Sequence, residues 1–189
     1  MRAARVVRHA SPSEAIEIQD VEVPDPGPGQ VRVAVAAASL NFGDIARCRG
    51  GVAAVLGTPP FTLGMDVAGT VEAAGDGMEQ WLGRRVVGIC PQSLGGLAGH
   101  ALAAPVFDAP PEYDDVQAAA FTLPFHVGWL ALHERAGLRA GETVLVRGGA
   151  SAVGTAAIQL AVAAGARVIA VAGGNGWMPN ARNARGASR

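Results

Sequence analysis

A glycine-rich turn in the last third of the sequence has residue types and a spacing that suit phosphate binding. It reads Gly148-Gly149-Ala150-Ser151-Ala152-Val153-Gly154. Gly149, Ser151 and Gly154 match the pattern G-x-G-x-x-G with serine at the middle position. A side chain there crowds an approaching pyrophosphate unless its hydroxyl bonds to the phosphate itself. The turn therefore indicates a phosphate site formed by Gly149, Ser151, Ala152, Val153 and Gly154.

The segments around the turn are those that a dinucleotide-binding unit requires. Residues 143–146 are an apolar run typical of a buried parallel strand. An alanine-rich segment after the turn is expected to form a helix that ends at Gly165, and residues 167–171 form a second apolar run. In such a unit the helix N-terminus offers free amide groups to a pyrophosphate. A plain packing unit without a ligand is the alternative, whereas a hydrolase nucleophile elbow is disfavoured because Val153 replaces the closing glycine of that turn.

The end of the second apolar run bears on the choice of cofactor. A site for NAD needs an acidic residue there to bind the ribose hydroxyls. This run ends Val171-Ala172-Gly173-Gly174, and no Asp or Glu follows Glu142 anywhere in the chain. We therefore expect NADPH rather than NADH, with Gly173 beside the cofactor.

Composition excludes several classes of function. The 189 residues are half hydrophobic and 16% charged, with a net charge of −1, so nothing suggests binding to nucleic acid or to a membrane surface. All basic residues are arginine, which removes Schiff-base chemistry and a P-loop. Cys48 and Cys90 have no metal-ligand spacing and are interpreted as buried thiols of a reduced, cytoplasmic protein, with a redox couple as the alternative. No signal peptide or membrane-spanning run is recognisable.

The first part of the chain predicts a small, barrel-like β domain. Residues 31–35 alternate with period two, and residues 66–73 and 85–89 are further strand candidates. Glycine and proline clusters separate these runs and predict turns. Near Asp114 the pattern changes to helix, and Pro124 is expected to open a second helix that runs to Gly137. The fold class is therefore α/β (α+β overall), a β domain followed by the start of a parallel α/β domain.

Several longer motifs resemble one enzyme superfamily when they are taken together. They are Ala38-Ser39-Leu40-Asn41-Phe42-Gly43-Asp44, Gly64-Met65-Asp66-Val67-Ala68-Gly69-Thr70-Val71, Gly95-Gly96-Leu97-Ala98, Gly137-Leu138-Arg139-Ala140-Gly141-Glu142-Thr143-Val144-Leu145-Val146 and Ala156-Ala157-Ile158-Gln159-Leu160-Ala161. With the glycine turn, their order and spacing resemble medium-chain dehydrogenases/reductases of the zinc-independent quinone oxidoreductase branch, like zeta-crystallin. The resemblance extends from residue 1 to about residue 173.

This resemblance implies a domain organisation and a reaction. It implies a GroES-like domain over residues 1–112 and a partial Rossmann domain over 113–173. Residues 174–189, which have no apolar periodicity, are expected to form a disordered tail. NADPH would bind between the two domains and deliver a hydride to a quinone or an enone. In zinc-dependent relatives a cysteine and a Gly-His-Glu segment supply metal ligands. Asn41 and Gly64-Met65-Asp66 stand at these positions here, so no metal is expected.

The same resemblance places Asn41 beside the nicotinamide and the substrate, which makes it the first candidate catalytic residue. A turn or capping role is the alternative for Asn41. Asp44 is the second candidate, since it could orient this loop or contact the cofactor. A surface or capping carboxylate is equally compatible with its position.

The resemblance stops at Gly173 or Gly174, although a dinucleotide fold needs about six strands. Residues 174–189 carry only positive charge and no apolar periodicity, which indicates a frameshift or premature end of the coding sequence, or else a real short variant with a basic tail. Relatives usually dimerise through Rossmann strands that are missing here. Two hypotheses follow, an NADPH-dependent reductase and a truncated, non-catalytic remnant of one.

Overall fold

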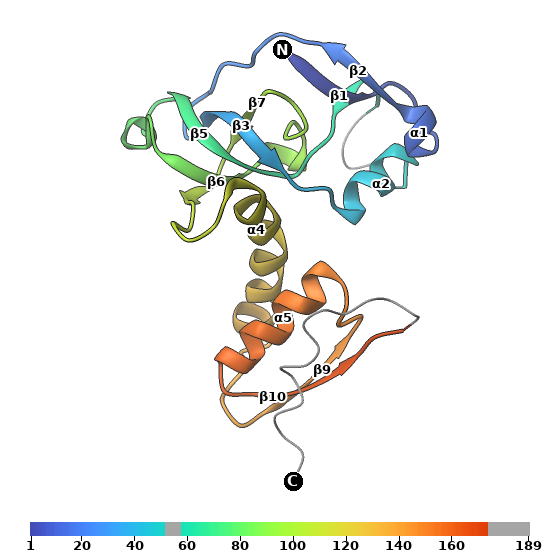
Figure 1. Ribbon diagram of the computed structural model, residues 1–189, viewed down its shortest axis with the longest axis vertical. Helices are drawn as coiled ribbons and strands as arrows, with labels where there is room; N and C mark the ends of the chain where they lie inside the picture. The colour runs from blue at the N-terminus through green and yellow to red at the C-terminus, as the bar shows by residue number, and fades with distance from the viewer. Residues whose placement is uncertain (52–57, 174–189) are drawn as a thin grey trace. The chain divides into compact units, whose positions relative to one another are not determined.

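The computed structural model describes residues 1–51 and 58–173, and the chain divides into two compact units, Met1–Leu123 and the part from Pro124 onward. Figure 1 labels the elements along the chain. Those of the first unit are β1 (Arg2–Val6), α1 (Pro12–Ala15), β2 (Ile16–Asp20), β3 (Val31–Ala38), α2 (Phe42–Cys48), β4 (Phe61–Thr62), β5 (Asp66–Ala74), η1 (Glu79–Trp81), β6 (Arg85–Ile89), η2 (Pro91–Ser93), β7 (His100–Ala103) and β8 (Val106–Asp108). Helix α4 (Asp115–Trp129) starts in this unit, and η3 (Leu130–Arg135), β9 (Thr143–Arg147), α5 (Ala152–Ala163) and β10 (Arg167–Val171) follow.

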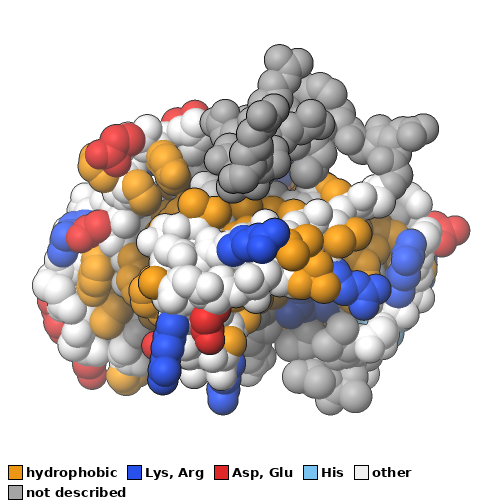
Figure 2. All heavy atoms as spheres, turned by 90° about the horizontal axis from the view of Figure 1, so that it is seen from below, with side chains coloured by type: hydrophobic (Ala, Val, Ile, Leu, Met, Phe, Trp, Pro, Cys, Tyr) orange, Lys and Arg blue, Asp and Glu red, His pale blue; other side chains and the backbone are white. Residues whose placement is uncertain are grey.

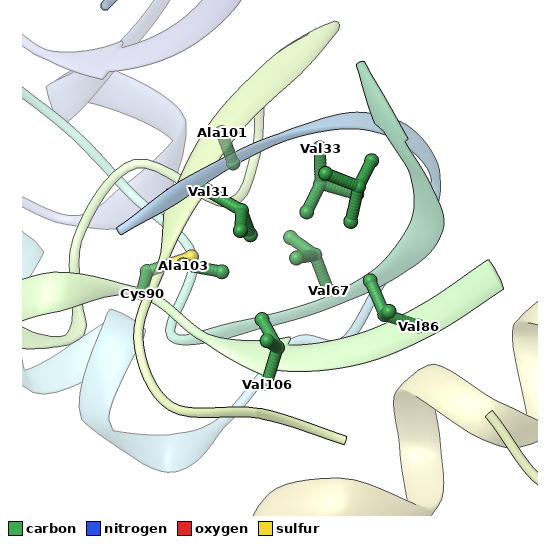
Figure 3. Close-up of a cluster of buried hydrophobic side chains, with 9 residues drawn as sticks. Val31, Val33, Val67, Val86, Cys90, Ala101, Ala103 and Val106 are labelled. Carbon is green, nitrogen blue, oxygen red and sulfur yellow. The ribbon is translucent and has the colours of Figure 1, made fainter. Parts of the chain in front are cut away.

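The first unit is built on a five-stranded antiparallel sheet with the order β7-β3-β5-β6-β8. The predicted alternation in β3 is confirmed over its first four residues, because Val31 and Val33 are fully buried while Arg32 and Ala34, which follow each of them, are partly exposed. Figure 3 shows the core cluster that these strands share, formed by Val31, Val33, Val67, Val71, Val86, Cys90, Ala101, Ala103 and Val106. Small, mostly β-branched side chains can approach closely on both faces of such a sheet.

A smaller sheet with the order β2-β1-β4 completes the first unit. Its core cluster contains Val6, Ala15, Cys48 and Leu63, so helices α1 and α2 are packed on it through Ala15 and Cys48. The strands predicted over residues 66–73 and 85–89 are both present, as β5 and β6.

Helix α4 differs from the prediction. Asp114 begins it as expected, because its carboxylate accepts the N–H of Gln117 at 2.7 Å while the Gln117 side chain accepts the N–H of Asp114 at 3.1 Å. Pro124, however, lies inside this helix and does not open a second one. Proline in a helix interior removes one hydrogen bond and disturbs the preceding turn. The N–H of Leu123, the residue before the proline, donates to Asp66 Oδ2 at 3.2 Å and so joins this turn to β5.

The second unit contains the predicted strand–turn–helix–strand order. Strands β9 and β10 pair in parallel, with Leu145 opposite Ile169, and α5 connects them. The predicted end of α5 at Gly165 is confirmed, since this glycine adopts a φ of +76°. The predicted tail over residues 174–189 lies outside the described residues.

The two strands leave large apolar side chains exposed. Leu145 is 59% exposed, Val171 52% and Ile169 46%. Figure 2 shows one face of the molecule on which hydrophobic side chains gather between arginines. A two-stranded sheet of this kind buries little apolar surface by itself. Among the described residues, no helix has the length and apolar character needed to cross a membrane.

Candidate functional site

The glycine-rich turn is fixed to the end of β10 by its own backbone. Gly148 adopts a φ of +74°, which glycine accepts without strain. The N–H groups of Gly148 and Gly149 both donate to the carbonyl oxygen of Val171, at 2.9 and 3.0 Å. The turn between β9 and α5 is thereby held at the carboxyl end of the parallel strand pair, the edge at which ligands bind in open α/β sheets.

Gly154 is required by the close approach of two backbone segments. A Cβ atom at this position would lie 2.2 Å from the carbonyl oxygen of Gly148 and 2.9 Å from the Cα of Gly149. At Gly149 a Cβ would lie 3.1 Å from the Cβ of Ala170 and 3.3 Å from Ile158 Cδ1, so the space is tight there too. Two of the three pattern positions thus have a packing reason to be glycine.

Ser151, at the middle position, is the N-cap residue of α5. Its hydroxyl donates to the carbonyl oxygen of Gly148 at 2.8 Å and accepts the N–H of Gly154 at 3.1 Å. The serine therefore caps the helix, and the donor hydrogen of its hydroxyl is already used within the turn.

The N–H groups of Ala152 and Val153 follow the cap in the first turn of α5. Within the described part of the chain neither N–H donates to another group, and both residues are exposed. Unpaired N–H groups at the start of a helix, together with the helix dipole, attract an anion. Gly173 lies just past β10 and is also exposed.

Asn41 lies in the first unit, where it begins α2. It is the N-cap residue, and its N–H donates to Asp44 Oδ2 at 2.8 Å as part of a capping box. Its side-chain Nδ2 donates to Ser39 Oγ at 2.9 Å and to Asp66 Oδ1 at 3.0 Å. The capping role that the sequence left open is present, and the amide also joins a polar network that extends to β5.

Asp44 is 3% exposed, which excludes the surface role that its sequence position allowed. Oδ2 accepts the N–H of Asn41, while Oδ1 accepts the N–H of Gly64 at 3.2 Å and lies 4.0 Å from Arg47 Nη1. Its two oxygens therefore link the start of α2 to the segment that precedes β5.

Asp66 is the centre of the network, and it is fully buried. Ser39 Oγ donates to Oδ1 at 2.5 Å, beside Asn41, and the N–H of Leu123 donates to Oδ2. Burial raises the pKa of Asp66 from its ordinary value, against the lowering effect of these three hydrogen bonds. Ser39 and Asp66 were not candidates from sequence, and their only signal was their place inside the quoted motifs.

The comparisons with known proteins agree with this fold. Residues 27–110 match the alcohol dehydrogenase GroES-like domain. Quinone oxidoreductase from Sus scrofa is 39% identical over 177 residues, which cover 92% of this chain and 53% of the relative. The crystal structure of an alcohol dehydrogenase superfamily protein from Novosphingobium aromaticivorans superposes with a TM-score of 0.82 at 35% identity, covering 92% of this chain and 54% of that one. The chain belongs to the medium-chain dehydrogenase/reductase superfamily.

Two further relatives are a quinone oxidoreductase solved with its cofactor and a much longer synthase. The quinone oxidoreductase of Thermus thermophilus, solved with NADPH, is 36% identical with a TM-score of 0.75, and the match covers 93% of this chain and 54% of that one. Phthioceranic/hydroxyphthioceranic acid synthase of Mycobacterium tuberculosis is 40% identical over 137 residues, 72% of this chain and 6% of the synthase. The chain spans about half the length of the quinone oxidoreductases that it matches. The predicted combination of a GroES-like domain with a partial Rossmann-like part is confirmed.

The positions at which zinc-dependent members of the superfamily hold the metal carry a different donor set in this chain. Asn41 Nδ2 is bonded to Ser39 and Asp66, and Met65 supplies a thioether in place of an imidazole. No group of three His, Cys, Asp or Glu side chains that could hold a metal ion occurs within residues 1–51 and 58–173. The side chains at this position therefore do not fit a zinc ion.

The two cysteines are both free and buried, as the sequence indicated. Burial, followed by the charges of Asp66 and Asp44, raises the pKa of Cys90 to about 12. Burial and the charge of Asp44 also raise the pKa of Cys48. Both thiols therefore stay protonated and weakly nucleophilic at neutral pH.

Proposed function

We propose that this chain carries the cofactor-binding elements of an NADPH-dependent, zinc-independent oxidoreductase that reduces a quinone or an enone. The observation that carries the proposal is the pair of N–H groups at Ala152 and Val153, which have no partner among residues 1–51 and 58–173, beside the close backbone approach at Gly154. That arrangement suits a pyrophosphate. The quinone oxidoreductases among the relatives support the reaction class.

The proposed site divides into a part for phosphate and a part for the reacting groups. Gly149, Ser151, Ala152, Val153, Gly154 and Gly173 are proposed to bind the cofactor, and Asn41 is proposed to contact both cofactor and substrate. Asp44 would hold Asn41 in place, since it accepts the N–H of that residue. NADPH, when bound, supplies the hydride, and the protein orients it.

The preference for NADPH rests on charge. No acidic residue follows Glu142 in the sequence. From the start of β9 onward there is therefore no carboxylate to repel the ribose phosphate of NADPH or to bind the free ribose hydroxyls of NADH. Domain limits at residues 112 and 173 and a location in the cytoplasm are part of the same proposal.

A second proposal, binding without turnover, is favoured by a specific observation. The parallel sheet has only the strands β9 and β10 within the described residues, and Leu145 and Val171 remain more than half exposed. Such a sheet could present the phosphate-binding turn without closing a site around the nicotinamide. The chain would then be a non-catalytic remnant of a reductase.

The purified 189-residue chain should be titrated with NADPH, and in parallel with NADH, by cofactor fluorescence, while a simple quinone such as 1,4-benzoquinone reports oxidation. Saturable NADPH binding with quinone-dependent oxidation supports the reductase, and saturable binding alone supports the second proposal. Gly154→Ala should weaken binding, whereas Val162→Ala, an exposed change in the same helix, should leave it unchanged. Absence of binding at millimolar NADPH would refute both proposals.

A further inference from the structure

The parallel pair β9–β10 has one face toward α5 and one face that is open to solvent. Figure 1 shows α5 on one side of the two strands. A Cβ atom at Gly149 would lie 3.1 Å from Ala170 Cβ and 3.3 Å from Ile158 Cδ1, so Ala170 is on the side of α5. Its pair Val146 on β9 lies on the same side. Because side chains alternate along a strand, the neighbouring positions point to the opposite side. We call that side the open face, and it is formed by Thr143, Leu145, Arg147, Arg167, Ile169 and Val171.

The open face has an apolar centre with an arginine at each end. Leu145 lies opposite Ile169, and these side chains are 59% and 46% exposed. Val171, which is 52% exposed, extends the centre beside Arg147, while Arg167 begins β10 at the other end. Contiguous exposed apolar side chains with polar residues around them are a feature of protein interaction sites.

The charges of these two arginines are not neutralised by the described residues. None of the ion pairs within residues 1–51 and 58–173 includes Arg147 or Arg167. The acidic residue nearest to them in the sequence is Glu142, and its carboxylate accepts the N–H of Arg139 at 2.8 Å in the turn before β9. No Asp or Glu follows Glu142. The open face therefore carries positive charge, which attracts an acidic partner.

The dimensions of the open face match those of one α-helix. Parallel sheets are normally covered by helices on both faces, and two neighbouring strands are about as wide as a helix, roughly 10 Å. Arg167 and Arg147 lie at opposite ends of five-residue strands, which places them about 13 Å apart along the strand direction. Seven residues of helix rise about 10 Å, and the long arginine side chains cover the difference. Acidic residues at helix positions i and i+7, with apolar residues at i+3 and i+4 between them, therefore fit this face.

Two other occupants are disfavoured by charge. Residues 174–189 carry only positive charge, and a second copy of the open face presents the same arginines. Either would bring like charges together, which opposes binding. We propose that the open face binds an amphipathic α-helix of a separate polypeptide, with Asp or Glu at positions i and i+7 and an apolar stripe between them. This inference goes beyond the proposed function, because it concerns the side of the sheet away from α5 and requires no cofactor.

Fluorescence anisotropy with synthetic peptides tests the charge preference of the open face. The probe is a fluorescein-labelled, alanine-based helical peptide of about 16 residues, with Leu at i+3 and i+4 and Glu at i and i+7. The control peptide has Lys in place of both Glu residues. At low salt the wild-type chain should bind the Glu peptide about tenfold more tightly than the Lys peptide, and added salt should reduce this difference.

Reversing the charges of the open face should reverse the preference. The double variant Arg147→Glu with Arg167→Glu should bind the Lys peptide more tightly than the Glu peptide, which also shows that it remains folded. Arg135→Glu with Arg139→Glu is the matched control, because it changes the charge of the second unit equally at exposed positions outside the open face. This control should keep the preference of the wild type.

The apolar centre is tested by two substitutions at equally exposed positions. Leu145→Ser should weaken binding of the Glu peptide about tenfold, because the leucine is covered in the complex. Val162→Ser should leave binding unchanged, although Val162 and Leu145 are both 59% exposed. Val162 lies on α5 and not on the open face.

Three peptide results would overturn the proposal. They are equal binding of both peptides by the wild type, an equal loss of both peptides in the double variant of Arg147 and Arg167, and no binding at millimolar peptide. Sedimentation of the chain without peptide tests the second copy. A wild-type dimer that Leu145→Ser dissociates would place that copy on the open face and also overturn the proposal, whereas an oligomeric state that Leu145→Ser does not change supports it.

Discussion

Replacing Gly154 by alanine is expected to destabilise α5 although alanine is the better helix former. The new methyl group would lie 2.2 Å from the carbonyl oxygen of Gly148, and it would also approach the Gly148 carbonyl carbon and the Gly149 Cα at 2.9 Å. All three are backbone atoms, so no side-chain rotation can relieve the contact. The turn or the helix must move.

The opposing effects differ in size. Overpacking of a well-packed site costs about 1–3 kcal/mol. Moving Gly154 also weakens its 3.1 Å bond to Ser151 Oγ, and loss of an N-cap bond costs about 1 kcal/mol. The gain in helix propensity from glycine to alanine is about 1 kcal/mol. The net expectation is a loss of about 2 kcal/mol in the stability of the second unit.

Hydrogen exchange followed by mass spectrometry measures this loss in the peptides that cover α5. A loss of about 2 kcal/mol corresponds to exchange that is about 30 times faster. Val162→Ala is the matched control, because Val162 is 59% exposed in the same helix and its replacement should not accelerate exchange. If Gly154→Ala exchanged as slowly as the wild type or more slowly, helix propensity would outweigh the backbone contact, and the close approach at the turn would be refuted.

Three other predictions concern ionisation, reactivity and the exposed sheet. Burial raises the pKa of Asp66 above its value in the unfolded chain, which is about 4, so the stability contributed by the protonated form is complete below about pH 4 and is lost as pH rises through the folded pKa. The free energy of unfolding in urea should therefore depend less on pH in that interval in Asp66→Asn than in the wild type. An unchanged slope would contradict this. Native Cys48 and Cys90 should react with Ellman's reagent at pH 8 only after unfolding, and prompt reaction of either thiol in the native chain would show that it is not buried. Leu145→Ser removes an exposed apolar side chain, so it should lower the fluorescence of bound ANS and change the free energy of unfolding by less than about 0.5 kcal/mol. Val146→Ala, at the buried neighbouring position, should lower the free energy of unfolding by about 1.5 kcal/mol. Equal effects of the two changes would contradict the assigned faces of β9.

Much of the local structure could be predicted because it depends on short-range patterns. The alternation at residues 31–35 predicted β3, and the same reasoning located β5 and β6 within a residue of their limits. The order of apolar run, glycine turn, alanine-rich segment and apolar run predicted β9, α5 and β10. Each of these signals lies within one element and its immediate neighbours.

Helix α4 was predicted wrongly because Pro124 has two compatible interpretations. Proline suits the first turn of a helix, but it is also tolerated within one when the groups that it leaves unpaired find partners. The contact that joins this part of the helix to β5 is made by Leu123, whose N–H donates to Asp66, and Asp66 is 57 residues away in the sequence. Nothing in the local sequence around Pro124 contains that information.

The sequence by itself determined β3, β5, β6, the β9–α5–β10 unit with its glycine-rich turn, and the motifs by which the superfamily was recognised. It also drew attention to Asn41 and Asp44. Only the tertiary structure decided that Asp66, 25 residues from Asn41, takes both the amide of Asn41 and the hydroxyl of Ser39. The reason is physical, since periodicity and capping act over a few residues, whereas the hydrogen-bond partners of the partly buried Asn41 amide are whichever groups the fold brings within about 3 Å of it.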